Sequence, residues 1–393
     1  MLRKRSRSMF GRATPFEQAL SGDSLDSRKA DPPNQLPAPA LSENLDEAPP
    51  QDRDKPQAAR TGLQSAIDAF RRGDYERGWR GYEWRYRQAP GDDLRAVTCA
   101  RSGRKIPHWL DGEPPERLLV VAEQGLGDSI QFIRYAADLC DRGVDVTLAD
   151  WPALTPLFSS AHPKLKFTSR HEAVSAESGE AFIRLLSLPL RLQCFEPLAR
   201  GAYLRAPAAS PEIAAELAEL IDPRMVNVGL VWRGNPGHAS DASRSMSLGA
   251  LKPLFDLAGL NLINLQHDPN PVSSDPGLLS AMRRPSDRLF GANRQLDGVA
   301  ALIRRLDMVI SVDTALAHLA GALGTRTLLM LHRPDPDWRW PSEPETAAWY
   351  TSMTRVTQQY PGDWRGAVNA ALPHLQRLIK VRRSSHDGSV RDL

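Results

Sequence analysis

The stretches VVAEQGLGDSIQFIRY (120–135) and MVISVDTALAHLAGALG (308–324) decide the fold. In each, an apolar strand is followed by a tight polar turn and then by a helical pattern. In an open α/β sheet, ligands bind where such turns lie, at the carboxyl ends of the strands. A helix that begins there offers unpaired backbone N–H groups and the positive end of its dipole, which favour phosphate. Two such units, about 190 residues apart, indicate two Rossmann-like domains that face a cleft.

The same alternation extends outward from both motifs. Further apolar strands are expected at 144–150, 226–232, 260–266 and 325–331. Strands that alternate with helices are typical of parallel sheets, so the fold class is α/β. An amphipathic stretch at 364–381 predicts a helix that closes the second domain.

Shifts in composition divide the chain into five parts. The first residues are rich in Pro, Asp, Ser and Ala and poor in large apolar side chains, which is typical of disorder. A Pro- and Ala-rich connector near residue 212 is expected to separate the two domains. The predicted parts are a disordered tail (1–57), a helix hairpin (58–90), an N-terminal acceptor domain (91–212), a C-terminal nucleotide-sugar domain with its closing helix (213–383), and a tail (384–393).

The hairpin carries an aromatic stripe. Tyr75, Trp79, Tyr82 and Tyr86 follow the Gly73-Asp74 turn at spacings of three or four residues. The pattern is similar to the last unit of a tetratricopeptide array, and one such unit cannot bury its own face. We therefore expect it to pack on the next domain as a structural cap; peptide binding is the alternative.

Bulk properties exclude several classes of protein. The net charge of +3 is small for 393 residues and does not favour nucleic acid. The odd number of cysteines, without a C-x-x-C pair, fits free thiols in a reducing compartment. No apolar run approaches the roughly 18–20 residues of a membrane span, and no signal-peptide pattern follows the basic N-terminus. We expect a cytoplasmic protein.

Asp128 is the candidate catalytic residue of the first motif. Gly125 and Gly127 allow the backbone to approach a ligand closely. Asp128 follows at the start of the helix, where it can act as a helix cap. It can also act as a general base that removes the proton of an attacking hydroxyl group. Both roles stay open from the sequence.

The second motif favours a donor site. Thr314 and His318 are i and i+4 on one side of the predicted helix, with Gly321 nearby. Leu319 and its apolar neighbours form the opposite stripe, so His318 is expected to project from the face that is not the core stripe. A lone helical histidine is usually a surface or packed residue, but beside the Asp313-Thr314 turn it is a candidate donor to phosphate or ribose.

The loop after strand 226–232 adds basic and polar groups. Arg233 leaves the strand at its carboxyl end, and Asn235 and Arg244 follow in the loop. The guanidinium fork of arginine suits phosphate, although a solvated loop charge is the alternative. Trp338 lies in DPDWRWPSE (335–343), where it either packs between domains or stacks on a base.

No metal or organic cofactor is expected. No His/Cys/Asp cluster has the spacing of metal ligands, and no D-x-D triplet or G-x-x-x-x-G-K-[ST] motif is present. Arginines and backbone donors are therefore expected to neutralise a leaving nucleotide.

Five stretches carry a family resemblance that covers roughly residues 60–370. They are GDYERGWRGYEWR, HWLDGEPPERLLVVAEQGLGDSIQFIRY, LVWRGNPGHASDASRS, SVDTALAHLAGALG and PDWRWPSEPETAAWYTSM. Together they resemble bacterial proteins that join tetratricopeptide repeats to a glycosyltransferase domain. These proteins are related to the ADP-heptose:lipopolysaccharide heptosyltransferases and, more remotely, to O-linked GlcNAc transferases. The resemblance implies the GT-B fold and metal-independent transfer with inversion at the anomeric carbon.

The resemblance also implies roles for particular residues. By position, Asp128 becomes the candidate base, and Asp313, Thr314 and His318 lie at the donor. The heptosyltransferases usually have Gly where this chain has Ala315, which weakens the case for a heptose donor in particular. The donor and phosphate candidates are Gly125, Gly127, Arg233, Asn235, Arg244, Asp313, Thr314, His318 and Gly321. Further cleft candidates are Gln124, Gln131 and Trp338.

The sequence thus predicts an inverting, metal-independent glycosyltransferase with a nucleotide-sugar donor. Because several repeat-containing relatives act on proteins such as flagellin, the acceptor is expected to be a protein or else a glycan or lipid. The alternative is a non-catalytic interaction protein that retains the fold. A nucleotide-sugar epimerase of the same fold is disfavoured, since nothing here resembles its motifs.

Overall fold

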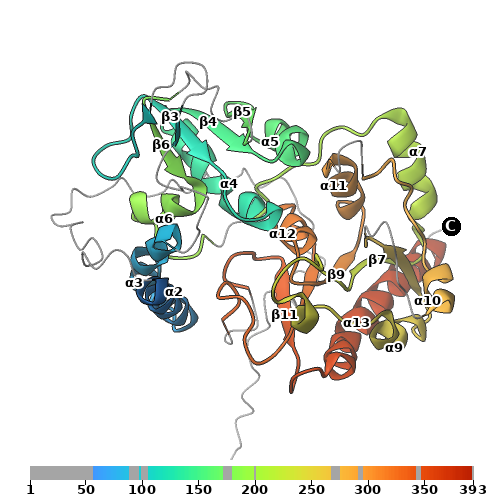
Figure 1. Ribbon diagram of the computed structural model, residues 1–393. Helices are drawn as coiled ribbons and strands as arrows, with labels where there is room; N and C mark the ends of the chain where they lie inside the picture. Colours follow the sequence, from blue (N-terminus) through green and yellow to red (C-terminus); the bar gives the residue numbers. More distant parts are fainter. Residues whose placement is uncertain are drawn as a thin grey trace, which may run out of the picture.

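The chain forms two parallel sheets, each flanked by helices (Figure 1). The computed structural model describes residues 56–87, 97–98, 105–170, 179–198, 201–266, 275–290, 295–341 and 347–391. The tail predicted for 1–57 lies outside these residues, except for its last two, which belong to the first described helix.

The first sheet has the strand order β5-β4-β3-β6, and all its pairings are parallel. Its strands are β3 (Arg117–Val121), β4 (Asp145–Asp150), β5 (Lys166–Ser169) and β6 (Ala181–Arg184). Its helices are α4 (Leu126–Asp141), α5 (Thr155–Ala161) and α6 (Leu188–Arg191), with 3-10 turns at Pro152–Leu154 and Leu185–Ser187. A two-stranded antiparallel ribbon, β1 (Val97–Thr98) with β2 (Lys105–Ile106), precedes it.

The second sheet has the order β11-β10-β9-β7-β8, again all parallel. Its strands are β7 (Val226–Val231), β8 (Leu260–Asn264), β9 (Met308–Val312), β10 (Thr327–Leu331) and β11 (Met353–Thr357). Its helices are α7 (Pro211–Leu220), α8 (Asp241–Arg244), α9 (Lys252–Phe255), α10 (Pro276–Ser280), α11 (Asp297–Ile303), α12 (Ala315–Ala322) and α13 (Trp364–Arg391), with a 3-10 turn at Leu248–Leu251. The α/β prediction with two parallel sheets is confirmed.

Helix α13 closes the second domain, as the sequence predicts. Trp364, Val368, Ala371 and Leu375 recur every three or four residues and pack into the same buried cluster as the strands of the second sheet. The helix continues through Arg391, where the sequence analysis placed a tail.

The strand orders place one switch point in each sheet. In the first sheet, β3 lies between β4, the next strand in the chain, and β6. In the second, β7 has β8 on one side and β9 on the other. Ligands of open α/β sheets bind at the carboxyl ends of the strands at such points. Both motifs follow switch-point strands, since α4 follows β3 and α12 follows β9.

The predicted hairpin consists of α2 (Pro56–Arg71) and α3 (Tyr75–Tyr82), followed by a 3-10 turn (Glu83–Arg87). It packs on both domains. The indole Nε1 of Trp79 donates to the carbonyl of Phe195 at 2.9 Å, and the ring of Phe70 stacks on Trp338 with centroids 4.2 Å apart. This packing agrees with the expectation of a structural cap. That the hairpin is a tetratricopeptide unit stays a prediction.

Candidate functional site

Asp128 lies in the first turn of α4 and closes its N-terminus. Gly125 is the N-cap residue, so Asp128 is the third residue of the helix rather than the cap itself. Its Oδ2 accepts the backbone N–H of Gly125 at 2.8 Å, which is the reciprocal half of a capping box. The preceding Gln124 has a φ of +59°, a left-handed conformation that is uncommon for a residue other than glycine. The turn before Asp128 is therefore tightly constrained.

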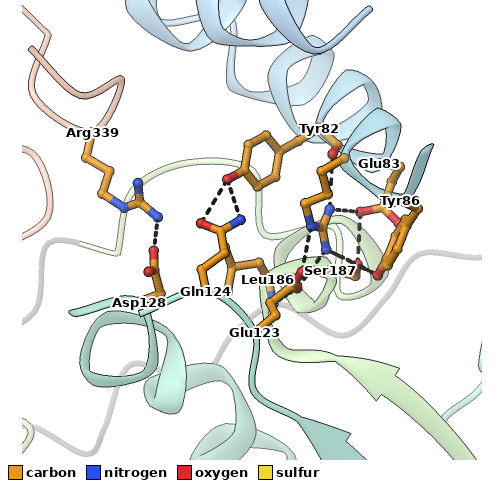
Figure 2. Close-up of polar contacts among 10 residues, drawn as sticks. Tyr82, Glu83, Tyr86, Glu123, Gln124, Asp128, Leu186, Ser187 and Arg339 are labelled. Carbon is orange, nitrogen blue, oxygen red and sulfur yellow. Dashed lines mark hydrogen bonds and ion pairs between the residues drawn. The ribbon is translucent and has the colours of Figure 1, made fainter. Parts of the chain in front are cut away.

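The second carboxylate oxygen of Asp128 is bound by Arg339 from the other domain (Figure 2). The same guanidinium donates to Oε1 of Gln131 at 2.7 Å and to Oδ1 of Asp337 at 2.9 Å. Arg339 is only 5% exposed. Although DPDWRWPSE is noted in the sequence, nothing in its pattern assigns Arg339 to Asp128, which is 211 residues away in the chain.

The second motif begins α12, with Thr314 at the N-cap position. The Thr314 hydroxyl lies 3.2 Å from that of Ser311 and makes no capping bond. His318, one turn later, has Nδ1 2.8 Å from the Tyr350 hydroxyl and Nε2 3.9 Å from Asp313 Oδ1. The helical spacing predicts that His318 projects away from the core stripe; the residue lies against Gly127 and Tyr350 and is buried there, with 6% exposed.

The two motifs meet at Gly127. A Cβ atom on this residue would lie 2.8 Å from Cδ2 of His318 and 3.5 Å from Cα of Ala315, so glycine permits the contact. This approach by the first domain explains the burial of His318. In Figure 1, α4 and α12 lie side by side between the two sheets. The starts of both motif helices thus form one site.

The loop after β7 reaches the same site through Arg244. Its Nη1 donates to the carbonyl of Asp313 at 3.2 Å, and its Nε lies 3.4 Å from Oδ1 of Asp241. Arg233 is partly buried and donates its backbone N–H to Gln266 at 3.0 Å. Asn235 is exposed, and its side chain accepts the N–H of Gly237 at 2.9 Å. Arg244 is therefore the member of this group with a direct bond to the second motif.

Of the remaining candidates, Gly321 and Trp338 take part in close packing, whereas Gln124 and Gln131 lie at the turn before α4 and in the first turns of that helix. Gly321 faces the Tyr350 ring, where a Cβ atom would lie 2.6 Å from ring carbons, so its observed part is close packing. Trp338 is 4% exposed within an aromatic cluster, which favours the packing interpretation. Gln124 is exposed on the turn, and its Nε2 donates to the Tyr82 hydroxyl at 3.0 Å. Gln131 is fully buried beside Arg339.

Arg85, in the 3-10 turn that follows the hairpin, reaches the switch point of the first sheet, where β3 ends. Its Nε and Nη2 bind the two carboxylate oxygens of Glu123 at 3.0 and 2.9 Å. The same guanidinium donates to Ser187 at 2.7 Å and to Glu83 at 2.6 Å. Figure 2 shows Glu123, Ser187 and Glu83 gathered beside the end of β3. Both members of the Arg85–Glu123 pair are buried. The turn at Gln124 and Gly125, beside Asp128, is exposed.

Burial sets the protonation of the site. It raises the pKa of Asp128, and the neighbouring Arg339 guanidinium partly offsets this rise. Burial and the Asp337 carboxylate raise the pKa of Asp313. Burial lowers the pKa of His318 to about 3, so its ring is neutral near pH 7 and offers a hydrogen bond rather than a charge.

Within the described ranges, no group of three or more His, Cys, Asp or Glu side chains could hold a metal ion. Among the same residues, no helix is long and apolar enough to cross a bilayer. Cys140 and Cys194 are buried and form no disulfide bond within the described residues; Cys99 lies outside them.

A known family matches part of the second half of the chain. Residues 284–361 match the glycosyltransferase family 9 (heptosyltransferase) model, and this range holds β9, α12 and Arg339. The sequence resemblance to the heptosyltransferases is confirmed. The Asp128 turn, by contrast, lies outside the matched range.

A curated relative and several solved structures are similar to this heptosyltransferase-like chain. Protein FlbA of Caulobacter vibrioides is 29% identical over 325 residues, covering 75% of this chain and 52% of FlbA, so the chain spans about half the length of that relative. The iron-containing glycosyltransferase TibC of enterotoxigenic Escherichia coli is 12% identical, with 71% of this chain and 82% of TibC covered and a TM-score of 0.44. The family 9 glycosyltransferase of Veillonella parvula is 10% identical, with 68% and 99% covered and a TM-score of 0.45. The E. coli heptosyltransferase WaaC, solved with ADP, is 12% identical, with 66% and 99% covered and a TM-score of 0.39.

Proposed function

We propose that the chain is an inverting, metal-independent glycosyltransferase of the GT-B type. It moves a sugar from a nucleotide-sugar donor to a hydroxyl group of a protein, or of a glycan or lipid. One observation carries the proposal: Asp128 on α4 and the Asp313–His318 segment at the start of α12 come together at Gly127. A candidate base thus lies close to a helix terminus of the kind that favours phosphate, which supports the proposal.

The roles follow from the chemistry of a single displacement. The acceptor hydroxyl attacks the anomeric carbon as Asp128 takes its proton, and the bond from that carbon to the diphosphate oxygen breaks. The charge that develops on the leaving diphosphate is stabilised by the N–H groups at the start of α12 and by the guanidinium of Arg244. One carboxylate acting as a base on the face opposite the leaving group gives inversion.

The ion pair between Arg339 and Asp128 is the observation that favours the alternative, a non-catalytic interaction protein. A carboxylate engaged by a buried guanidinium is a weaker base, because the opposite charge favours its ionised form. The two proposals differ in donor binding and turnover. Nucleotide binding without turnover in the wild-type chain supports the interaction protein; slow hydrolysis of a bound nucleotide sugar supports the enzyme.

Replacing His318 with Ala is expected to weaken nucleoside diphosphate binding by ~1–3 kcal/mol, roughly 5- to 150-fold, the range for losing a hydrogen bond to a charged group. Isothermal titration calorimetry of the full chain with ADP, GDP, UDP and CDP measures this change. His374→Ala, on α13, is the matched control and is expected to bind as the wild type does. Equal affinity in the His318 variant and in its control would remove His318 from the donor site.

Chelation is expected to leave nucleotide binding and donor hydrolysis unchanged. Arginines and helix N-termini can hold a diphosphate without a metal ion. The test compares the wild-type protein in EDTA with the same protein in Mg²⁺, by calorimetry and by release of nucleoside diphosphate. Loss of both in EDTA, with recovery on adding Mg²⁺, would contradict metal independence.

A further inference from the structure

Arg339 binds across the domain boundary at a place where one buried donor has no acceptor. Nε2 of Gln131 is buried and has no hydrogen-bond partner. Its side-chain oxygen accepts from Nε of Arg339 at 2.7 Å, so the unpaired amide N–H groups lie beside the guanidinium. An unpaired buried donor is costly and uncommon, and it calls for an explanation.

The Arg339 guanidinium also has more N–H groups than it uses in these hydrogen bonds. Arginine carries five N–H groups, and Arg339 uses its Nε, Nη1 and Nη2 atoms for one side chain each, namely Gln131, Asp337 and Asp128. Each Nη atom has a second N–H group. Gln131 and Asp128 are i+3 and i on one face of α4. Amide and guanidinium donors therefore converge at the edge of the site and lack an oxygen acceptor of matching geometry.

Arg339 also lies near the residues that are proposed to bind the sugar donor. His318 and Asp313 both feel its charge, and the ring of the adjacent Trp340 lies 5.4 Å from that of His318. Gly127, one residue before Asp128, contacts His318 directly. Arg339 thus lies near the residues at the start of α12, where the proposed function puts the diphosphate.

We propose that Arg339 and Gln131 bind the diphosphate of the donor, and that Arg339 leaves Asp128 when the donor arrives. This inference rests on the proposed function. In the structure, the Arg339 guanidinium and the Asp128 carboxylate form an ion pair. A phosphoryl oxygen supplies the acceptor that the two donors lack and competes with the carboxylate for the same guanidinium. Once Arg339 has left, that carboxylate oxygen is free to take the proton of the acceptor hydroxyl group, which orders donor binding before proton removal.

In this proposal, Asp128 and the diphosphate compete for Arg339. The Asp128→Asn variant is therefore expected to bind diphosphate about tenfold more tightly than the wild type, because its neutral amide competes less for the guanidinium. Arg339→Gln is expected to bind about tenfold more weakly, and Arg339→Lys to fall between, since lysine keeps the charge but not the fork. In the double variant, Asp128→Asn with Arg339→Gln, the gain disappears. Gln131→Leu weakens binding severalfold.

The measurement is calorimetry of the full chain in EDTA with two probes, inorganic pyrophosphate and ADP. Asp335→Asn is the matched control: it lies in the same segment but is exposed and pairs with Arg71. A gain of affinity in Asp128→Asn cannot come from misfolding. Unchanged affinity in Asp128→Asn or in Arg339→Gln, with ADP still binding to the wild type, would overturn the inference and leave the proposed function standing. Absence of nucleotide binding in every protein would refute both.

Discussion

The Asp128→Asn variant is expected to lose turnover by ~10²–10⁴-fold while remaining folded, because an amide cannot take the proton of the attacking hydroxyl group. The readout is hydrolysis of the nucleotide sugar that the protein binds, in which water takes the place of the acceptor. This readout needs the same proton removal and does not depend on knowing the acceptor.

The structure refines what this substitution costs in stability. Asp128 accepts from Gly125 on one oxygen and from Arg339 on the other, whereas the amide of Asn has only one oxygen. One of the two donors must then face an NH₂ group, at a cost of about 1–2 kcal/mol. Asp337→Asn is the matched control, because it also removes a carboxylate partner of Arg339 but leaves the base in place. Near-normal hydrolysis in folded Asp128→Asn would reduce Asp128 to its capping role.

Replacing Arg85 with Met is expected to destabilise the protein by about 3–5 kcal/mol, the largest effect on stability in this account. Arg85 is 6% exposed and Glu123 is 3% exposed. Without the guanidinium, the Glu123 carboxylate stays buried and keeps the backbone N–H of Leu186 as a hydrogen-bond donor. A buried charge without its partner is far more costly than the net contribution of the pair.

Urea denaturation of the full chain, followed by tryptophan fluorescence, measures this effect. The double variant Arg85→Met with Glu123→Gln removes both buried charges and is expected to recover part of the loss. The result bears on the hairpin, since Arg85 lies in the 3-10 turn that follows α3. If the single variant loses less than about 1 kcal/mol of unfolding free energy, the hairpin does not contribute to the stability of the first domain.

Local patterns predict the strands before both motifs and the start of α4 at the Asp128 turn; the catalytic role of Asp128 stays a prediction. The strands before both motifs are continuous apolar runs, and the glycines of the first turn mark the start of α4. These signals lie within a few residues of each other in the chain, so the hydrophobic period and the turn residues indicate the strands and the helix start directly.

The pairings between distant segments could not be predicted in this way. Arg339 lies in an aperiodic loop after β10, and its partners Asp128 and Gln131 are in the other domain. Helical period describes one helix alone, so it does not predict that His318 is buried against Gly127 on α4 and against Tyr350. A charged residue in an irregular stretch carries no periodic signal, so its partner appears only when the chain is folded.

The central claim is that the start of α12 binds a nucleotide-sugar donor. Thermal unfolding of the full chain with a panel of nucleoside diphosphates and nucleotide sugars tests it most directly. A ligand at a hundredfold excess over its Kd stabilises the folded state by roughly 2.7 kcal/mol, which shifts the melting temperature by about 5–10 °C for a domain of this size. We expect such a shift with at least one nucleoside diphosphate and its loss in His318→Ala. No shift with any member of the panel at millimolar concentration would contradict it.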